Sequence, residues 1–185
     1  MGIDTKVPIE DAILVNKVLK GNVDSFEILV KKYQLNVLKF VYGMLKEKEA
    51  SEDITQEVFI TVYNKLSLYN NKYSFLNWIL QIAKNKTIDY TRKYRKIYES
   101  DINEEYNLST KDMGPEEIAE YKDTRNKVQS YINTLEIMDR QILSLRYTQD
   151  YTFKEISEIL GVTETTVKRR YYKVRERFKE YKNKC

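Results

Sequence analysis

The sequence predicts an all-α protein: two small helical domains joined by a flexible linker, with a helix-turn-helix in the second domain. Three observations lead to this prediction. Apolar residues recur at spacings of three and four, which is the helical period, rather than at the strand spacing of two. The 185 residues include only five Gly and two Pro, so two long blocks are free of helix breakers. Gly and Pro fall together only at Gly114-Pro115, between these blocks.

The first predicted domain covers residues 20–96 and follows an N-terminal extension at 1–19. Its first helix is expected to open near Asp24-Ser25, either of which can act as the N-cap. A second helix is expected from about 50 to 66, and a third begins near Tyr73-Ser74. The first helix carries a continuous apolar stripe for the core, made of Phe26, Leu29, Val30, Tyr33, Val37, Val41 and Leu45.

One face of the second helix is polar and acidic. Asp53, Gln56, Glu57 and Ile60 stand at offsets of 0, 3, 4 and 7, so they share one stripe. Paired carboxylates can catalyse glycoside cleavage, but they must then face each other across a substrate cleft, which neighbours on one helix face do not do. Two readings remain: a solvated face that keeps the protein soluble, or a docking surface for a basic partner protein.

The end of the third helix is basic. Residues 84–96 carry six Lys or Arg and one Asp, a net charge of +5. Just upstream, the segment 68–73 is polar and contains Tyr69 and Tyr73. Aromatic rings beside cations are what a protein needs to stack and hold single-stranded bases. The alternative is a solvated helix end beside a linker, and Trp78 fits a core position better than a base platform.

Residues 97–114 are expected to be an acidic, flexible linker. Positions 98–117 hold seven acidic side chains and one basic, a net charge of −6, with few apolar residues to bury. Fully extended, eighteen residues could reach about 60 Å.

The second predicted domain covers residues 115–185. Phe153, Ile156, Ile159 and Leu160 indicate a short helix, Gly161 tolerates a positive φ, and Thr163 can cap the next helix. That helix is strongly basic, with a net charge of +6 over 164–184. A short helix, a glycine turn and a longer basic helix are the layout of a helix-turn-helix that enters the major groove of DNA. The alternative is a solvated helix packed on a bundle. Its inward stripe is Val167, Tyr171, Val174 and Phe178.

Composition excludes several classes of function. The sequence contains no His, which removes Ser-His-Asp and Cys-His nucleophiles and His-ligated metals. No metal or cofactor site is therefore expected, and no catalytic residue. The single Cys cannot form an internal disulfide, and no segment reads as a signal peptide or a membrane span. We expect a cytoplasmic protein with no stable membrane insertion.

Several segments together resemble the extracytoplasmic-function group of sigma-70-family factors. They are DSFEILVKKY, ASEDITQEVFITVYNKL and YSFLNWILQIAKNKTIDYTRKYRK, a linker ending in GPEE, and DRQILSLRYTQDYTFKEISEILGVTETTVKRRYYKVRERF. The resemblance covers about 24–96 and 115–180 in the family's motif order. It implies a bacterial transcription initiation factor, not an enzyme, that binds core RNA polymerase and directs it to promoter DNA.

The resemblance also implies roles for individual residues. In the helix that binds polymerase, the matching positions are Asp53, Gln56 and Glu57. In the region that recognises and melts the minus-ten element, Tyr69 lies in the loop that captures a flipped base, and Asn85, Asp89 and Arg92 hold the opened strand. In the region that contacts the minus-thirty-five element, the matching positions are Thr166, Lys168, Arg169, Tyr172 and Lys173.

Two alternatives stay open from the residues themselves. A polymerase-independent regulator would use only the helix-turn-helix and would leave the acidic stripe without a role. A nuclease or other nucleic-acid enzyme would need a metal-binding carboxylate cluster, which the sequence does not show.

The family often works with a membrane-bound anti-sigma factor, so one is a possible partner. Glu164 departs from the family pattern at the start of the basic helix, where it lies close to the expected DNA.

Overall fold

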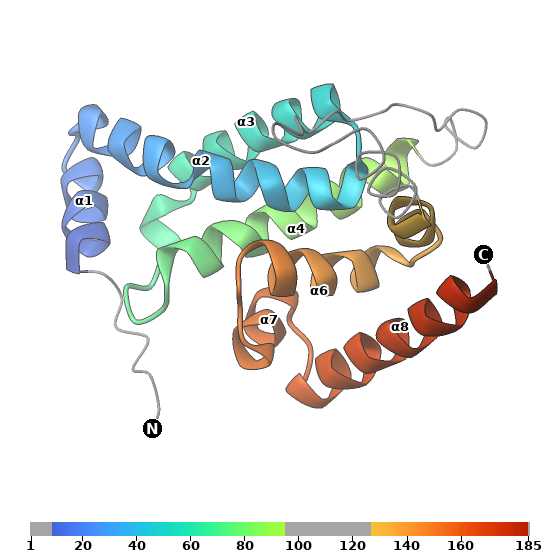
Figure 1. The fold of residues 1–185 in the computed structure, drawn as a ribbon. Helices are drawn as coiled ribbons and strands as arrows, with labels where there is room; N and C mark the ends of the chain where they lie inside the picture. Colours follow the sequence, from blue (N-terminus) through green and yellow to red (C-terminus); the bar gives the residue numbers. More distant parts are fainter. Residues whose placement is uncertain (1–8, 95–126, 185) are drawn as a thin grey trace, which may run out of the picture.

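The computed structural model describes residues 9–94 and 127–184, and all regular structure within these ranges is helical (Figure 1). The first range contains α1 (Ile9–Leu19), α2 (Val23–Leu45), α3 (Lys48–Asn64), the 3-10 turn η1 (Leu66–Leu68) and α4 (Phe75–Tyr94). The second contains a helical stretch at 127–133, then α6 (Ile137–Thr148), α7 (Phe153–Leu160) and α8 (Glu164–Lys184). The all-α prediction is confirmed. The predicted linker at 97–114 lies outside the described residues.

The N-cap predicted for α2 was wrong by two to three residues. Asn22 caps the helix, because its side-chain oxygen accepts a hydrogen bond of 2.8 Å from the backbone N–H of Ser25. Ser25 is itself buried inside the first turn, and Asp24 contributes its charge to that turn. Asn, Asp and Ser are about equally good caps, so the sequence alone cannot choose between the three candidates Asn22, Asp24 and Ser25.

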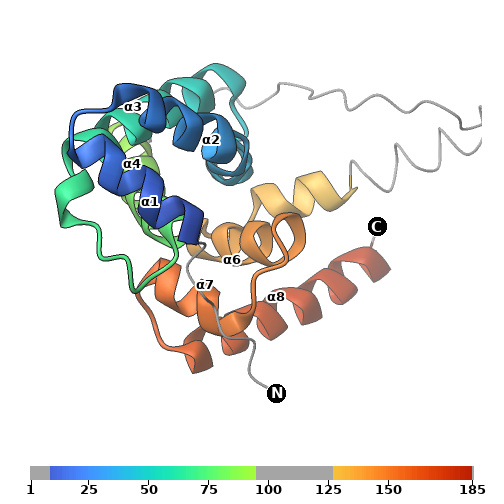
Figure 2. The same cartoon turned by 90° about the vertical axis from the view of Figure 1, so that its left-hand side faces the viewer.

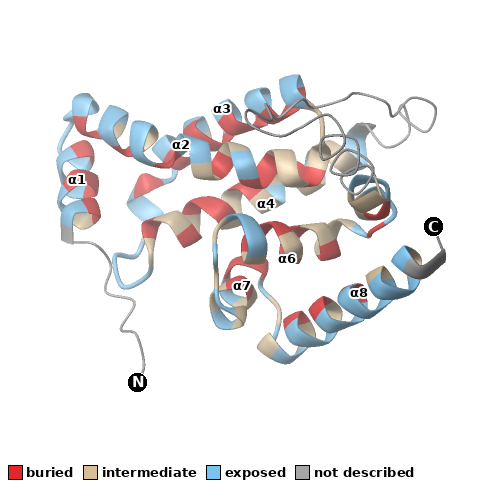
Figure 3. Ribbon diagram, in the orientation of Figure 1, coloured by how far each residue is buried: buried red, intermediate tan, exposed pale blue. Residues whose placement is uncertain are grey.

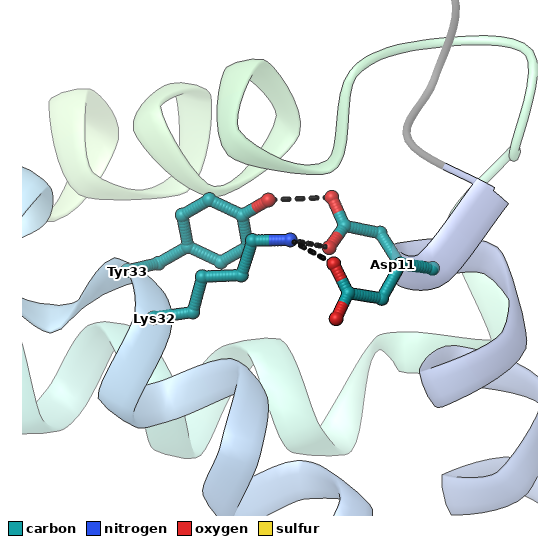
Figure 4. A network of polar contacts seen from close by, with 4 residues as sticks. Asp11, Lys32 and Tyr33 are labelled. Atoms are coloured by element: carbon teal, nitrogen blue, oxygen red, sulfur yellow. Dashed lines mark hydrogen bonds and ion pairs between the residues drawn. The ribbon is translucent and has the colours of Figure 1, made fainter.

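The N-terminal helix α1 packs against α2 and belongs to the first helical body. Its Asp11 is fully buried and is held by two residues of α2 (Figure 4). The Tyr33 hydroxyl donates to one carboxylate oxygen at 2.5 Å, and Lys32 Nζ lies 2.7 Å from the other. Burial and the adjacent Asp11 carboxylate raise the pKa of Tyr33 far above its ordinary value, so the phenol stays a donor. Residues 9–19, which the sequence placed in an extension, are therefore tied to the core.

The helix-turn-helix forms as the sequence predicts. Thr152 and Glu155 make a capping box at the start of α7, each satisfying a backbone N–H of the other residue. Gly161 ends α7 with φ at 68°, in the left-handed region that favours glycine. The Thr163 side chain then accepts from the backbone N–H of Thr166 and caps α8.

The two described halves of the chain pack against each other. In two views at right angles, α6 lies beside α2, and α7 lies beside the first half of α4 (Figures 1 and 2). One hydrophobic cluster runs through both halves, from Phe40 and Ile79 in the first to Ile142 and Ile156 in the second. Most of the buried apolar residues in both halves belong to this shared cluster, and much of the ribbon of α3 and α8 is coloured as exposed (Figure 3).

Candidate functional site

The outer face of α3 carries the predicted docking residues. Asp53, Gln56 and Glu57 are all exposed, while Ile54 and Val58 on the opposite face are buried. The fold brings Glu57 beside the basic end of α4, where its carboxylate accepts a hydrogen bond of 2.9 Å from Lys86. Asp53 and Gln56 make no such contact in the described residues, so they present an acidic and polar surface to solvent.

A groove between α2 and α3 adjoins this surface, and the sequence analysis did not find it. Its volume is about 480 Å³, and it is lined by Leu35, Leu38 and Gln56 among others. Leu35 is 56% exposed, and Ile60 of the acidic stripe is 62% exposed. A sequence signal did exist, because Leu35 is an apolar residue that falls off the buried stripe of α2. The face therefore combines exposed apolar side chains with acidic ones.

Tyr69 lies in the loop between η1 and α4, but its ring is half-buried. The ring packs edge-on against Phe75, with centroids 5.0 Å apart, and lies 5.3 Å from Trp78. Its hydroxyl donates to the carbonyl of Tyr73 at 2.5 Å, and burial raises its pKa to about 12. Tyr69 thus braces the loop. The exposed aromatic ring of this loop is Tyr73, which is 65% exposed.

The loop also forms one wall of a hollow of about 320 Å³. The other wall belongs to α1, with Asn16 and Leu19 facing Asn70 and Asn71. The sequence predicted no contact between the extension and this loop.

Asn85, Asp89 and Arg92 are exposed and share one stripe of α4. The neighbouring positions Ala83 and Thr87 are buried, and the Thr87 hydroxyl donates back to the Ala83 carbonyl at 2.8 Å. The residues predicted to hold the opened strand therefore lie on the solvent-exposed face of α4.

The exposed face of α8 gathers the predicted major-groove residues. Lys168, Arg169, Tyr172 and Lys173 are exposed, and Val167, Tyr171 and Val174 are buried against the rest of the domain. Glu164 and Lys168 form an ion pair of 2.7 Å one turn apart, and this pair raises the pKa of Lys168. Lys168 therefore neutralises the negative charge that Glu164, the residue that departs from the family pattern, adds at the start of the helix. The Thr166 hydroxyl lies 2.9 Å from that of Thr163 at the helix start.

Arg170 has a different role from its neighbour Arg169. Its guanidinium bonds Asp139 at 2.6 Å and also reaches Glu136, so it ties α8 to the start of α6. The two carboxylates raise the pKa of Arg170, although its partial burial acts in the opposite direction. Arg170 contributes to the net charge counted for this helix from sequence, yet its spacing of three from Val167 and four from Val174 places it beside the buried stripe.

The described ranges contain no group of three or more His, Cys, Asp or Glu side chains arranged to hold a metal ion. Among the same residues, no helix is both long enough and apolar enough to cross a membrane.

The fold and these surfaces are those of a helix-turn-helix protein, a class of nucleic-acid-binding protein, with a separate exposed acidic face on α3. Comparison with known families identifies both halves. The family Sigma-70 region 2 matches residues 29–97, and the family Sigma-70, region 4 matches residues 125–178.

Curated relatives match over most of their length. The chain is 31% identical over 170 residues to the ECF RNA polymerase sigma factor SigW of Bacillus subtilis (strain 168), covering 88% of this chain and 91% of that one. It is 28% identical over 174 residues to the ECF RNA polymerase sigma-E factor of Escherichia coli (strain K12), covering 90% and 91%. The chain belongs to the extracytoplasmic-function RNA polymerase sigma factors.

Solved structures show the same fold. CnrH, solved in complex with the cytosolic domain of CnrY, gives a TM-score of 0.69 at 18% identity, covering 94% of this chain and 97% of that one. The sigma factor RpoE, solved with the anti-sigma factor NepR from Bartonella quintana, gives 0.65 at 17% identity, covering 85% and 96%. The protein is thus a transcription initiation factor that directs RNA polymerase to promoter DNA.

Proposed function

We propose that three separate surfaces divide the work of initiation. The exposed face of α3, with Asp53, Gln56 and Glu57, binds core RNA polymerase. Asn85, Asp89 and Arg92 of α4, with the loop braced by Tyr69, recognise and hold the opened minus-ten strand. On α8, the minus-thirty-five element is contacted by Thr166, Lys168, Arg169, Tyr172 and Lys173.

The observation that carries this proposal is the charge and exposure of each face. The α3 face is acidic and has exposed Leu35 and Ile60 at its edges, which suits a basic protein partner with apolar contacts. The α8 face is cationic, and Arg and Lys neutralise phosphates and read guanine edges in the major groove. A polymerase-independent regulator would have no use for the α3 face.

Flipping a base out of a duplex costs a few kcal/mol, so a promoter-opening protein needs a dedicated surface to recover that cost. The loop at 69–73 offers the exposed Tyr73 ring at the start of α4, and the exposed stripe of α4 leads away from the loop to Arg92 and Lys93 in the last turn of the helix. Because Tyr69 itself is packed, we propose that it holds the loop in shape while its exposed neighbours contact the base.

Charge reversal on α3 tests the docking role. Asp53→Lys should weaken binding to purified core polymerase at least tenfold, because a partner that suits an acidic face is basic. Helix content and binding to promoter DNA by α8 should stay unchanged. The matched control is Asp24→Lys, which reverses an exposed acid on α2. Equal affinity of Asp53→Lys and the unchanged chain for core polymerase would refute this assignment.

Transcription with core polymerase distinguishes an initiation factor from a polymerase-independent regulator. The chain mixed with core polymerase should yield start-specific transcripts from a cognate promoter, and Arg169→Ala should lower them. If the chain bound promoter DNA but never bound core polymerase, the regulator alternative would hold instead.

We further propose that the protein performs no chemistry of its own and works in the cytoplasm beside the polymerase. An anti-sigma factor is a proposed partner, by likeness to the relatives solved with one.

A further inference from the structure

Asp11 of α1 is a buried acid to which the proposed function gives no role. Its carboxylate accepts from the Tyr33 hydroxyl at 2.5 Å and from Lys32 Nζ at 2.7 Å, both on α2 (Figure 4). Burying an ion pair costs solvation, and apolar side chains of similar volume often give equal or greater stability. Stability alone therefore does not account for an acid at this position. What the acid adds is direction, because two hydrogen bonds fix how α1 is placed and rotated against α2.

Tyr33 joins Asp11 to the loop that carries Tyr69. The Tyr33 ring packs against Phe75 at the start of α4, with centroids 5.8 Å apart, and Phe75 packs edge-on against Tyr69 at 5.0 Å. The Tyr69 hydroxyl donates to the Tyr73 carbonyl and so closes the loop. Burial and, after it, the charge of Asp11 raise the pKa of Tyr69 to about 12, so the carboxylate lies within electrostatic reach of the loop. A continuous series of contacts thus leads from Asp11 to the loop.

Helix α1 also faces the loop directly. The stripe of α1 that lines the hollow of about 320 Å³ beside the loop is Ala12, Val15, Asn16 and Leu19. These positions stand at offsets of 0, 3, 4 and 7, so they share one side of the helix. Asp11 precedes the first of them, so holding Asp11 sets which side of α1 is turned to the loop. Because α1 has only 11 residues, and so short a helix is marginal by itself, its placement depends on such contacts.

These contacts assign Asp11 a role in the shape of the loop. Resting on the proposed function, in which the loop at 69–73 captures a base of the minus-ten strand, we propose that Asp11 is a positioning residue. Through Tyr33 and α1 it holds the loop in the shape that receives the base. A loop that had to be ordered only on binding would add its ordering entropy to the cost of base flipping.

The first test measures the loop in the free chain. A spin label at Lys72→Cys, in a Cys185→Ser chain, reports the mobility of the loop by its electron paramagnetic resonance line shape. Asp11→Ala should raise the mobile fraction about twofold or more, because the loop loses its support. The same label at Lys39→Cys, an exposed position of α2, should report no change. An unchanged line shape at position 72 in Asp11→Ala would overturn the proposal.

The second test measures promoter opening by the holoenzyme. Permanganate oxidation of unpaired thymines in the minus-ten element gives the opened fraction. At holoenzyme concentrations that saturate the promoter, Asp11→Ala should lower this fraction about tenfold, because the flipped base is no longer held. Affinity for core polymerase and for the minus-thirty-five duplex should stay unchanged. Asp11→Asn keeps an acceptor for the Tyr33 hydroxyl and should restore part of the opening.

A separate control excludes a general loss of stability. Ile54 of α3 is 4% exposed and takes part in none of the ring contacts described above. Ile54→Ala removes a buried apolar side chain from the same half, and it should open the promoter normally at temperatures where the chain is folded. If Ile54→Ala and Asp11→Ala lowered opening equally, Asp11 would contribute stability alone and the positioning role would be wrong.

A double-mutant cycle shows whether Asp11 acts through Tyr33. Tyr33→Phe removes the hydroxyl and should lower opening in the same direction. In the chain with both Asp11→Ala and Tyr33→Phe, opening should be no lower than in Asp11→Ala alone, because both changes cut the same connection. Additive losses would show two independent effects and would contradict the proposal.

Failure of this proposal can be told from failure of the proposed function. Normal opening by an Asp11→Ala chain whose loop has become mobile would overturn the positioning role and leave the proposed function in place. Absence of opening by holoenzyme with the unchanged chain would contradict the proposed function instead. The line shape at position 72 would still decide whether Asp11 orders the loop.

Discussion

At the scale of the residue, neighbouring side chains of the same type have different roles, because the helix turns them to different surroundings. Arg169 is exposed on α8, whereas Arg170 reaches back to Asp139 and Glu136 on the α6 side. Asp11 and Asp53 differ in the same way, since one is buried with two partners and the other faces solvent.

Replacing the two arginines one at a time should show that Arg170 contributes to the stability of the fold and Arg169 to promoter binding. Arg170→Ala should lower the free energy of unfolding by about 1–2 kcal/mol, because it leaves the largely buried Asp139 carboxylate without its partner. Arg169→Ala should leave stability unchanged and weaken promoter binding by about 1–3 kcal/mol if it reads a base. Urea unfolding followed by circular dichroism and promoter titrations measure the two effects.

A uniform loss of affinity across promoter sequences in Arg169→Ala would show a phosphate contact rather than base reading. Equal stability of Arg170→Ala and the unchanged chain would contradict the bracing role.

Asp11→Ala should lower the free energy of unfolding by about 2–3 kcal/mol. The change leaves the buried Tyr33 hydroxyl without its acceptor and removes the anion that faces Lys32. The expected cost is kept below that of a fully buried pair because the Lys32 side chain is 34% exposed. Unfolding monitored by the fluorescence of Trp78 measures it. A change below 0.5 kcal/mol, a threshold of about the size typical of surface substitutions, would mean that α1 is not anchored through Asp11.

At the scale of the element, local signals determine where most helices begin and end. Gly161 and Thr163 mark the turn of the helix-turn-helix, and both act as their chemistry predicts. The start of α2 was less certain from sequence because Asn22, Asp24 and Ser25 all have capping side chains. The structure selects Asn22, since Ser25 is buried in the first turn.

Thr152→Ala should destabilise α7 by about 1 kcal/mol, because it removes the hydroxyl that accepts a hydrogen bond from the backbone N–H of Glu155. Thr152→Ser keeps the hydroxyl and should retain most of the stability. Hydrogen exchange of the amides at the start of α7 measures both variants. Equal exchange rates in Thr152→Ala and Thr152→Ser would show that the cap contributes little.

At the scale of the whole molecule, the shared hydrophobic cluster couples the two halves. Ile142 of α6 is 1% exposed and belongs to the same cluster as Phe75 and Ile79 of α4. Helices that share a core lose stability together when one of its members is cut back.

Ile142→Ala should therefore lower the midpoint of unfolding seen by Trp78, which is the only tryptophan and lies in the first half. The expected loss is about 2–4 kcal/mol in total, as for other large-to-small changes in cores. Circular dichroism and Trp78 fluorescence should give one coincident transition. If Ile142→Ala shifts only the circular dichroism signal and leaves the Trp78 transition in place, the two halves unfold independently.

Helical period and capping chemistry are local properties, so patterns along the chain predict the helical class, the helices α2, α3, α4, α7 and α8, the turn at Gly161 and the outward positions of Asp53 and Arg169. The burial of Asp11, the bracing roles of Tyr69 and Arg170, the groove at Leu35 and the close approach of Gly43 to Ser144 of α6 are visible only in the tertiary structure. Each of these depends on which helix lies opposite, at separations such as 21 residues for Asp11 and Lys32 or 96 for Met44 and Arg140. Contacts between segments so far apart leave no periodic signal in the chain.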